Sequence, residues 1–144
     1  AIRFLERRKP ATQTVGLELE LADMLIHLRA TLDTGCHLTD PITCLPVLVV
    51  SFPDAKNRLP QSVREYLSSW FAGNSPGEPP AGIKLRVIPC KTAAQRSLLP
   101  GFAVNNIGLI TQNGILALGR SAVAFAPQSF GSDSYEALYG NDFL

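Results

Sequence analysis

Alternation of apolar and polar residues indicates β-structure in the first third of the chain. Residues 15–21 read Val-Gly-Leu-Glu-Leu-Glu-Leu, a pattern typical of a strand with one buried face. A turn at residues 22–24 leads into a second alternating segment, residues 25–32. After a turn at 38–43, the apolar run at 45–50 predicts a strand buried on both faces. The pattern therefore predicts a hairpin followed by an interior strand.

The remaining apolar segments predict two further hairpins. Residues 83–89 alternate as a strand, and residues 98–104 can return beside them. Residues 107–110 and 114–118 form a second candidate pair around a turn at 111–113. Residues 74–82, which precede the strand at 83–89, are rich in proline and glycine and predict a loop.

One segment, residues 60–71, has the spacing of an amphipathic helix. Pro60 stands near its start and Gly73 just after its end, as is common at helix boundaries. A second, short helix is predicted around residues 135–139, because Ser132-Asp133-Ser134 offers an N-cap. The apolar residues that share one face of the first helix are Val63, Tyr66, Leu67 and Trp70.

Composition predicts one domain with a modest core. Apolar residues make up 46% of the 144 residues and charged residues 17%, and the net charge is +1, so we expect no nucleic-acid partner. The apolar runs are far shorter than a bilayer-spanning helix. We assign residues 15–144 to the domain and residues 1–14 to a linker or first strand.

The three cysteines, Cys36, Cys44 and Cys90, cannot all pair, and we interpret them as reduced thiols. Their spacing does not suit a metal site, and we predict no metal or cofactor. A thiol enzyme remains an alternative, in which Cys36 works with His37 or His27. Adjacent residues point apart, so Cys36 and His37 would make a poor pair.

The tripeptide Asp33-Thr34-Gly35 directly follows the second predicted strand and occurs once in the chain. Aspartic proteases present their catalytic carboxylate on this tripeptide at a strand end. Their chemistry needs two carboxylates that share one proton, one to activate water and one to donate to the carbonyl oxygen. One copy therefore predicts a homodimer with Asp33 from each subunit as catalyst. Thr34 and Gly35 would support the turn.

Residues 30–47 read Ala-Thr-Leu-Asp-Thr-Gly-Cys-His-Leu-Thr-Asp-Pro-Ile-Thr-Cys-Leu-Pro-Val. This stretch resembles the sporulation sigma-E factor-processing peptidases, the SpoIIGA family of endospore-forming bacteria, which read approximately A-x-L-D-T-G-N-x-L-x-D-P-x-T-x-x-P-V there. Residues 86–89, 98–102 and 132–144 are also similar to that family. Cys36 stands where the family often has Asn, and Gly140-Asn141 replaces a pair resembling His-Pro.

The resemblance implies a mainly β fold, a retropepsin-like aspartic protease β-barrel with one inserted helix and a short C-terminal helix. It implies an endopeptidase that removes the N-terminal pro-sequence of a sporulation sigma factor precursor, with a forespore signal protein as activator. It also implies anchoring in the cell membrane through an additional N-terminal region, with this domain on the cytoplasmic, mother-cell side. Arg3, Arg7, Arg8 and Lys9 fit a basic segment next to a membrane helix.

The hairpin built from residues 83–89 and 98–104 is the candidate flap that would close over substrate. Late in the chain, either Leu118-Gly119 or Val123-Ala124 would brace the catalytic turn, and the sequence leaves this choice open. The alternative function is a non-catalytic retropepsin-like binding or scaffold domain. The candidate flap tip consists of Cys90, Lys91, Thr92, Ala93, Ala94, Gln95, Arg96 and Ser97.

Overall fold

The computed structural model describes residues 14–33, 38–91 and 96–143. Residues 1–13, which include most of the predicted linker or first strand, lie outside these ranges. The elements of the described part are β1 (Thr14–Leu21), β2 (Met24–Leu32), β3 (Val47–Ser51), α1 (Phe52–Ala55), η1 (Lys56–Arg58), α2 (Gln61–Phe71), β4 (Leu85–Lys91), β5 (Arg96–Val104), β6 (Ile107–Thr111), β7 (Gly114–Ala117), β8 (Ser121–Ala126), β9 (Ala137–Tyr139) and η2 (Asn141–Phe143).

The described strands form one mixed sheet in the order β4-β5-β8-β3-β9-β2-β1-β6-β7. Its centre is built by two parallel pairs, β3 with β8 and β2 with β9, whereas β9 runs antiparallel to β3. The sheet does not close, because β4 and β7 remain its two edges, but it curls enough for β1 to contact β5. The predicted mainly β class is confirmed, and this curled sheet fits the predicted barrel-like arrangement.

Apolar side chains pack on both faces of the sheet. Leu48 and Val50 of β3 belong to a core that also contains the buried residues of α2. Val47 and Val49 belong to a second core on the other face, together with Phe130. Because successive side chains of β3 alternate between the two cores, the whole strand is buried. This explains the continuous apolar run that predicted an interior strand.

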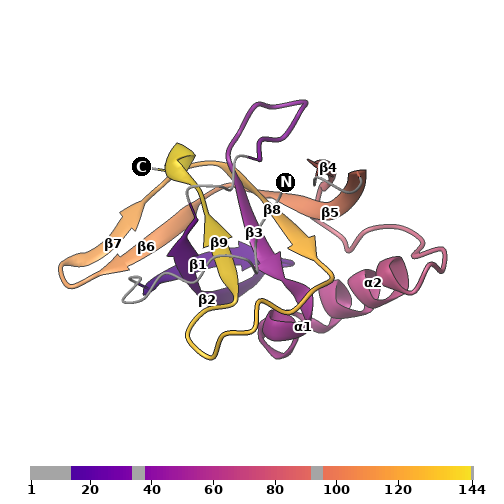
Figure 1. Ribbon diagram of the computed structural model, residues 1–144, viewed down its shortest axis with the longest axis horizontal. Helices are drawn as coiled ribbons and strands as arrows, with labels where there is room; N and C mark the ends of the chain where they lie inside the picture. The colour runs from indigo at the N-terminus through magenta and orange to yellow at the C-terminus, as the bar shows by residue number, and fades with distance from the viewer. Residues whose placement is uncertain (1–13, 34–37, 92–95, 144) are drawn as a thin grey trace.

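The predicted inserted helix is confirmed as α2. Val63, Tyr66 and Leu67 are buried in the first core, where the Tyr66 ring lies 6.1 Å from the ring of Phe102. A four-residue helix, α1, was not predicted. It follows β3 directly, and the hydroxyl of Ser51 accepts a hydrogen bond from the backbone N–H of Asp54 as its cap. Both helices lie at one end of the molecule, away from the segment 38–46 (Figure 1).

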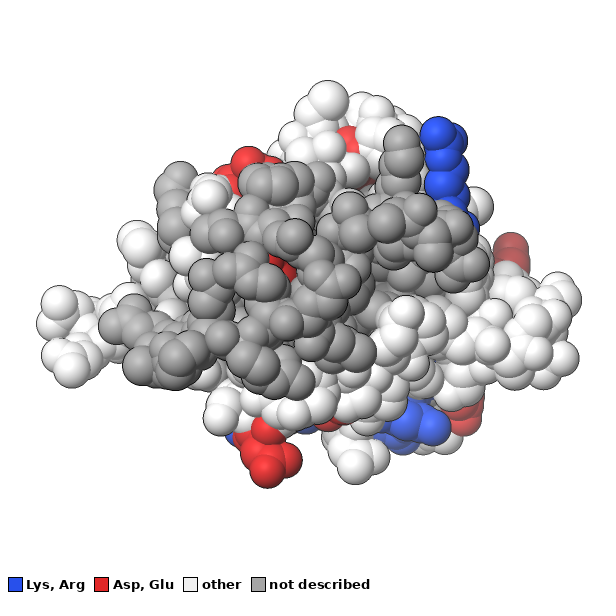
Figure 2. Space-filling view, viewed as in Figure 1, with Lys and Arg blue, Asp and Glu red and all other residues white. Residues whose placement is uncertain are grey.

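The three predicted hairpins are confirmed. β1 and β2 are joined by Ala22 and Asp23, whose φ angles of 50° and 62° suit a two-residue hairpin turn. β4 pairs with β5, and β6 pairs with β7. The hairpin of β6 and β7 projects from the body, with every residue of β7 exposed (Figure 1). On the face of the molecule shown in this view, the visible acidic and basic residues are few and scattered (Figure 2).

The position of the C-terminal helix was predicted wrongly. Residues 137–139 form strand β9, inserted between β2 and β3, and the helical turn η2 comes later, at Asn141–Phe143. The Ser-Asp-Ser segment that suggested a helix N-cap precedes this strand instead. The space between β2 and β3 is filled by β9, and pairing on both sides outweighs the local preference.

Candidate active site

Asp33 directly follows β2, in the interior of the sheet. Its backbone N–H donates a hydrogen bond of 2.9 Å to the carbonyl oxygen of Tyr139, the last residue of β9. The preceding residues 30–32 pair in parallel with residues 137–139. The side chain of Asp33 is half-buried. Asp33 thus stands at a strand end whose backbone is held by a central strand, the position predicted for a catalytic carboxylate. Its catalytic role stays a prediction.

Thr34 and Gly35, the predicted supports of Asp33, lie outside the described residues, as do Cys36 and His37. Their roles stay predictions. The chain is described again from Leu38, whose side chain is buried in the second core. The tripeptide is therefore flanked by a paired strand on one side and a buried residue on the other.

After the tripeptide in the chain, residues 38–46 fold back on themselves. The backbone N–H of Asp40 donates to the carbonyl oxygen of Leu45 at 3.0 Å, and that of Cys44 donates to the carbonyl oxygen of Asp40 at 2.7 Å. Cys44 adopts a φ of 61°, in the left-handed region that closes tight turns. The turn predicted at 38–43 is confirmed and continues to the start of β3.

Asp40 holds this turn to the hairpin of β4 and β5. Its side chain is only 3% exposed, and it accepts hydrogen bonds from Nε of Arg86 at 2.8 Å and from the backbone N–H of Ile42 at 2.9 Å. Burial is the largest influence on the pKa of Asp40 and raises it, but these hydrogen bonds and the guanidinium charge outweigh burial. The pKa of Asp40 therefore lies below its ordinary value, and the carboxylate is ionised at neutral pH.

The sequence alone assigns no role to Asp40 or Arg86. Arg86 lies on β4, the first strand of the candidate flap hairpin, so the ion pair links the segment behind Asp33 to that hairpin. The Asp-Pro step at residues 40–41 belongs to the pattern that resembles the SpoIIGA family. The available signal was a charged residue, Asp40, in the turn between two predicted strands.

The candidate flap tip is described at its two ends. Lys91 pairs with Arg96, and Cys90 pairs with Ser97, whose hydroxyl lies 3.4 Å from the carbonyl oxygen of Cys90. The connecting residues 92–95, which are Thr92, Ala93, Ala94 and Gln95, lie outside the described residues. The hairpin itself is confirmed, and its function as a flap stays a prediction.

A second buried carboxylate, Glu136, fastens the start of β9 to β2. Its side chain is 1% exposed and accepts from the backbone N–H of Arg29 at 2.6 Å and from Nη2 of Arg29 at 2.7 Å. Nε of Arg58 lies 3.7 Å from Oε2 of Glu136. The hydrogen bond to Glu136 is the main reason that the pKa of Arg29 is raised. This network was not predicted, because Glu136 was expected in a helix.

Whether Leu118-Gly119 or Val123-Ala124 braces the turn at Asp33 stays a prediction. Val123 and Ala124 lie within buried β8, parallel to β3, whereas Gly119 donates its backbone N–H to Oδ1 of Asn106. The described backbone partner of Asp33 comes from neither segment, because it is Tyr139. Strand β9 is thus a supporting element that sequence reasoning missed.

Of the residues named for the thiol alternative, only His27 is described; Cys90, which that alternative did not include, is the buried cysteine among the described residues. His27 is exposed on β2, where its Nε2 lies 3.3 Å from Oε1 of Glu18. His27 precedes Asp33 by six residues, which is roughly 20 Å along an extended strand. Burial raises the pKa of the Cys90 thiol, partly opposed by a hydrogen bond with Ser97. A buried thiol with a raised pKa is a weak nucleophile.

Within residues 14–33, 38–91 and 96–143, no three His, Cys, Asp or Glu side chains gather as they would around a metal ion. No helix in these ranges is long and apolar enough to cross a membrane.

Comparison with known proteins identifies the family of this chain. No curated protein and no solved structure matches the chain. The sequence model of a peptidase family, described as sporulation factor SpoIIGA, matches residues 2–142, which is nearly the whole chain. The match covers Asp33, the segment behind it, the β4–β5 hairpin and β9. The chain therefore belongs to the SpoIIGA family of sporulation peptidases.

Proposed function

We propose that the protein is an aspartic endopeptidase that works as a homodimer, with Asp33 of each subunit in one catalytic pair. The observation that carries this proposal is the position of Asp33, half-buried at the end of β2 with its backbone bonded to Tyr139. A carboxylate fixed at a strand end can be brought against its symmetry mate with little loss of freedom. The peptidase family supplies the reaction class.

The chemistry follows from two carboxylates a few ångströms apart. Like charges at that distance cannot both ionise, so the pair holds one proton. The ionised member removes a proton from water, and the protonated member donates to the carbonyl oxygen of the peptide. The two pKa values then belong to the pair and not to either carboxylate alone. Because the chain contains Asp-Thr-Gly once, the second carboxylate comes from a second copy.

The proposed substrate is the N-terminal pro-sequence of a sporulation sigma factor precursor, bound as an extended strand beneath the β4–β5 hairpin. A forespore signal protein would activate cleavage, and the domain would face the cytoplasm of the mother cell. Anchoring in the membrane through a further N-terminal region would raise the effective concentration of subunits and favour the dimer.

The first test compares processing of the precursor by the membrane-anchored protein, co-expressed with the precursor and the signal protein. Asp33→Ala and Asp33→Asn should abolish processing, whereas Asp142→Asn, an exposed aspartate on η2, should leave it intact. Normal processing by Asp33→Ala would remove the aspartic mechanism and favour the binding-domain or thiol alternative.

A second test asks whether the catalytic pair is shared between subunits. Wild-type protein and Asp33→Asn are co-expressed in equal amounts at constant total protein. If both carboxylates are needed, only dimers of two wild-type subunits work, and activity falls to about a quarter, whereas independent sites would retain about half. A retained half would contradict the shared pair even if Asp33 proves essential.

A further inference from the structure

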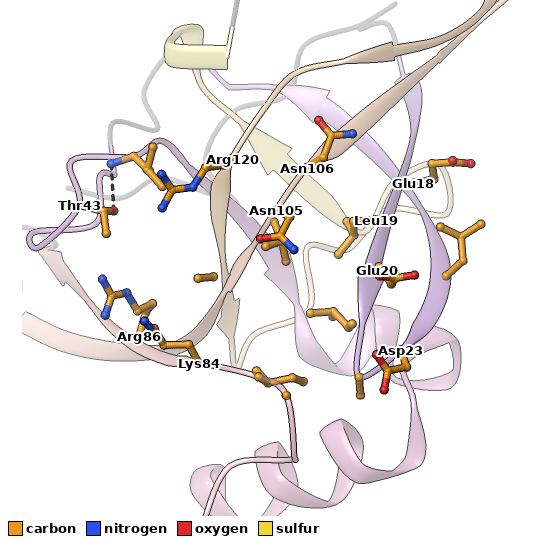
Figure 3. A pocket seen from close by; sticks show the side chains of 18 residues that line it. Glu18, Leu19, Glu20, Asp23, Thr43, Lys84, Arg86, Asn105, Asn106 and Arg120 are labelled. Carbon is orange, nitrogen blue, oxygen red and sulfur yellow. Dashed lines mark hydrogen bonds between the residues drawn. The ribbon is translucent and has the colours of Figure 1, made fainter.

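A cleft of about 570 Å³ lies where the turn of the β1–β2 hairpin approaches the base of the β4–β5 hairpin (Figure 3). This volume is within the range of ligand-binding sites. Its lining includes Leu19, Leu21 and Val104, which are buried and form an apolar floor. Asp33 and the described ends of the candidate flap tip are not among the lining residues. The cleft therefore does not include Asp33, although it borders the segment 38–46 and β4 through Thr43 and Arg86.

The two walls of the cleft carry opposite charges. Figure 3 shows the acidic residues on the β1 side and the basic residues on the opposite side, with the amides of Asn105 and Asn106 between them. The acidic wall consists of Glu18, Glu20 and Asp23, and the basic wall of Lys84, Arg86 and Arg120.

These charges are not neutralised across the cleft. Glu18 pairs with His27 and Arg86 with Asp40, both outside the cleft. For Glu20, Asp23, Lys84 and Arg120, the described part of the chain offers no ion-pair partner, and all four are exposed. The fold therefore holds an acidic wall and a basic wall apart over an apolar floor. A ligand that carries both positive and negative groups could neutralise both walls at once.

The backbone beside the acidic wall is also open. Leu19 is the last residue of β1 that pairs with β6, so Glu20 and Leu21 pair with β2 alone. Of the basic residues, Arg86 lies on β4, which is an edge strand of the sheet. Exposed strand edges accept extended peptides by main-chain hydrogen bonds. The open backbone favours a peptide over a small zwitterion.

We propose that this cleft binds an extended peptide segment that carries acidic and basic side chains a few residues apart. The acidic side chains face Lys84 and Arg120, and the basic side chains face Glu20 and Asp23. The site requires neither peptide hydrolysis nor a dimer, so it stands or falls independently of the proposed function.

The test uses the 144-residue chain and a blocked hexapeptide, acetyl-Glu-Glu-Ser-Gly-Lys-Lys-amide, followed by amide chemical shifts in NMR titrations. Hexapeptides with Glu or Lys at all four charged positions, and the dipeptide Glu-Lys, serve as comparison ligands. We expect shifts at the cleft residues and affinity for the mixed hexapeptide at least about fivefold higher than for either single-sign peptide or the dipeptide. Binding should weaken as salt concentration rises.

Charge-reversal variants locate the site. Lys84→Glu with Arg120→Glu, and separately Glu20→Lys, should each weaken binding of the mixed peptide by roughly tenfold. Lys56→Glu and Glu78→Lys reverse exposed charges outside the cleft and should leave affinity unchanged. Equal binding of a single-sign peptide, equal binding of the dipeptide, shifts elsewhere in the molecule, or insensitivity to wall reversal would each overturn the proposal.

Discussion

The carboxylate of Asp40 accepts a 2.8 Å hydrogen bond from Nε of Arg86, and this buried ion pair joins the turn behind Asp33 to strand β4. The side chains of Asp40 and Arg86 are 3% and 13% exposed. Charges so far removed from water are costly unless they are paired and hydrogen-bonded. The ion pair therefore adds a specific polar contact between the β4–β5 hairpin and the segment after Asp33, beside the pairing of β5 with β8 and the apolar packing of the second core.

Arg86→Met should lower the free energy of unfolding by about 3 kcal/mol, because it leaves a buried carboxylate without its counter-charge. Urea unfolding followed by fluorescence of Trp70 measures the change. The double variant Asp40→Asn with Arg86→Met should recover part of the loss, since no buried charge then remains unpaired. Lys84→Met, on an exposed neighbouring position before β4, is the matched control and should change stability by less than about 0.5 kcal/mol.

The pH dependence of stability should carry the signature of Asp40. Burial raises the pKa of Asp40, but the hydrogen bonds from Ile42 and Arg86 lower it by a larger amount. The pKa in the folded chain therefore lies below the ordinary value of 3.8. The unfolded chain then binds the proton more readily than the folded chain. The stabilisation is fully present above the unfolded value and is lost as pH falls through the folded value.

Urea unfolding at a series of pH values from neutral to acidic measures this dependence. Asp40→Asn should be less stable than the native chain at neutral pH and should lose less stability on acidification. Asp142→Asn, at an exposed position, should follow the native profile. Parallel profiles for Asp40→Asn and the native chain would show that Asp40 is not the linked group.

The network around Glu136 predicts unequal effects for its two arginines. The guanidinium of Arg29 donates close hydrogen bonds to Glu136, which Arg29→Ala would remove, whereas Nε of Arg58 stays 3.7 Å away. Arg29→Ala should therefore cost about 2 kcal/mol, and Arg58→Ala less than about 1 kcal/mol. Thermal unfolding followed by circular dichroism compares the two. Equal losses of stability would mean that the burial of Glu136, and not the close hydrogen bonds, determines how much this network stabilises the fold.

The sequence predicts those parts of the fold in which neighbours along the chain decide the structure. β1, β2 and their turn follow from alternation, and α2 follows from its apolar face and flanking residues. The buried run at 45–50 predicted β3, because a strand between two cores needs apolar residues on both faces. Asp33 is placed at a strand end by the same local signals.

Contacts between distant residues account for what the sequence did not predict. Asp40 and Arg86 are 46 positions apart, and Arg29 and Glu136 are 107 positions apart, so no local period connects them. Strand β9 has only three residues, and its identity depends on the space left between β2 and β3. Local reasoning assigned that segment to a helix, because a possible N-cap was visible and the two strand partners were not.

The backbones of β5 and β8 approach each other closely at Gly101. A Cβ at this position would lie 2.6 Å from the carbonyl oxygen of Val123 and 3.1 Å from Cα of Ala124, both backbone atoms. Gly101→Ala should therefore push the strands apart and cost about 1–3 kcal/mol in urea unfolding. Gly16→Ala is the matched control, because its Cβ would meet only the side chain of Ile110, nearest at 3.3 Å. A loss at Gly16 as large as that at Gly101 would contradict the backbone clash.

The two described cysteines should differ sharply in reactivity. Cys44 is exposed, whereas Cys90 is 4% exposed and has a thiol pKa raised by burial, with partial opposition from Ser97. Only the thiolate reacts with iodoacetamide, so at mildly alkaline pH Cys44 should be alkylated first and Cys90 only after urea is added. Mass spectrometry of proteolytic fragments measures both rates in one sample. Rapid alkylation of Cys90 in the folded chain would show that the β4–β5 hairpin opens at its described end and exposes the thiol without global unfolding.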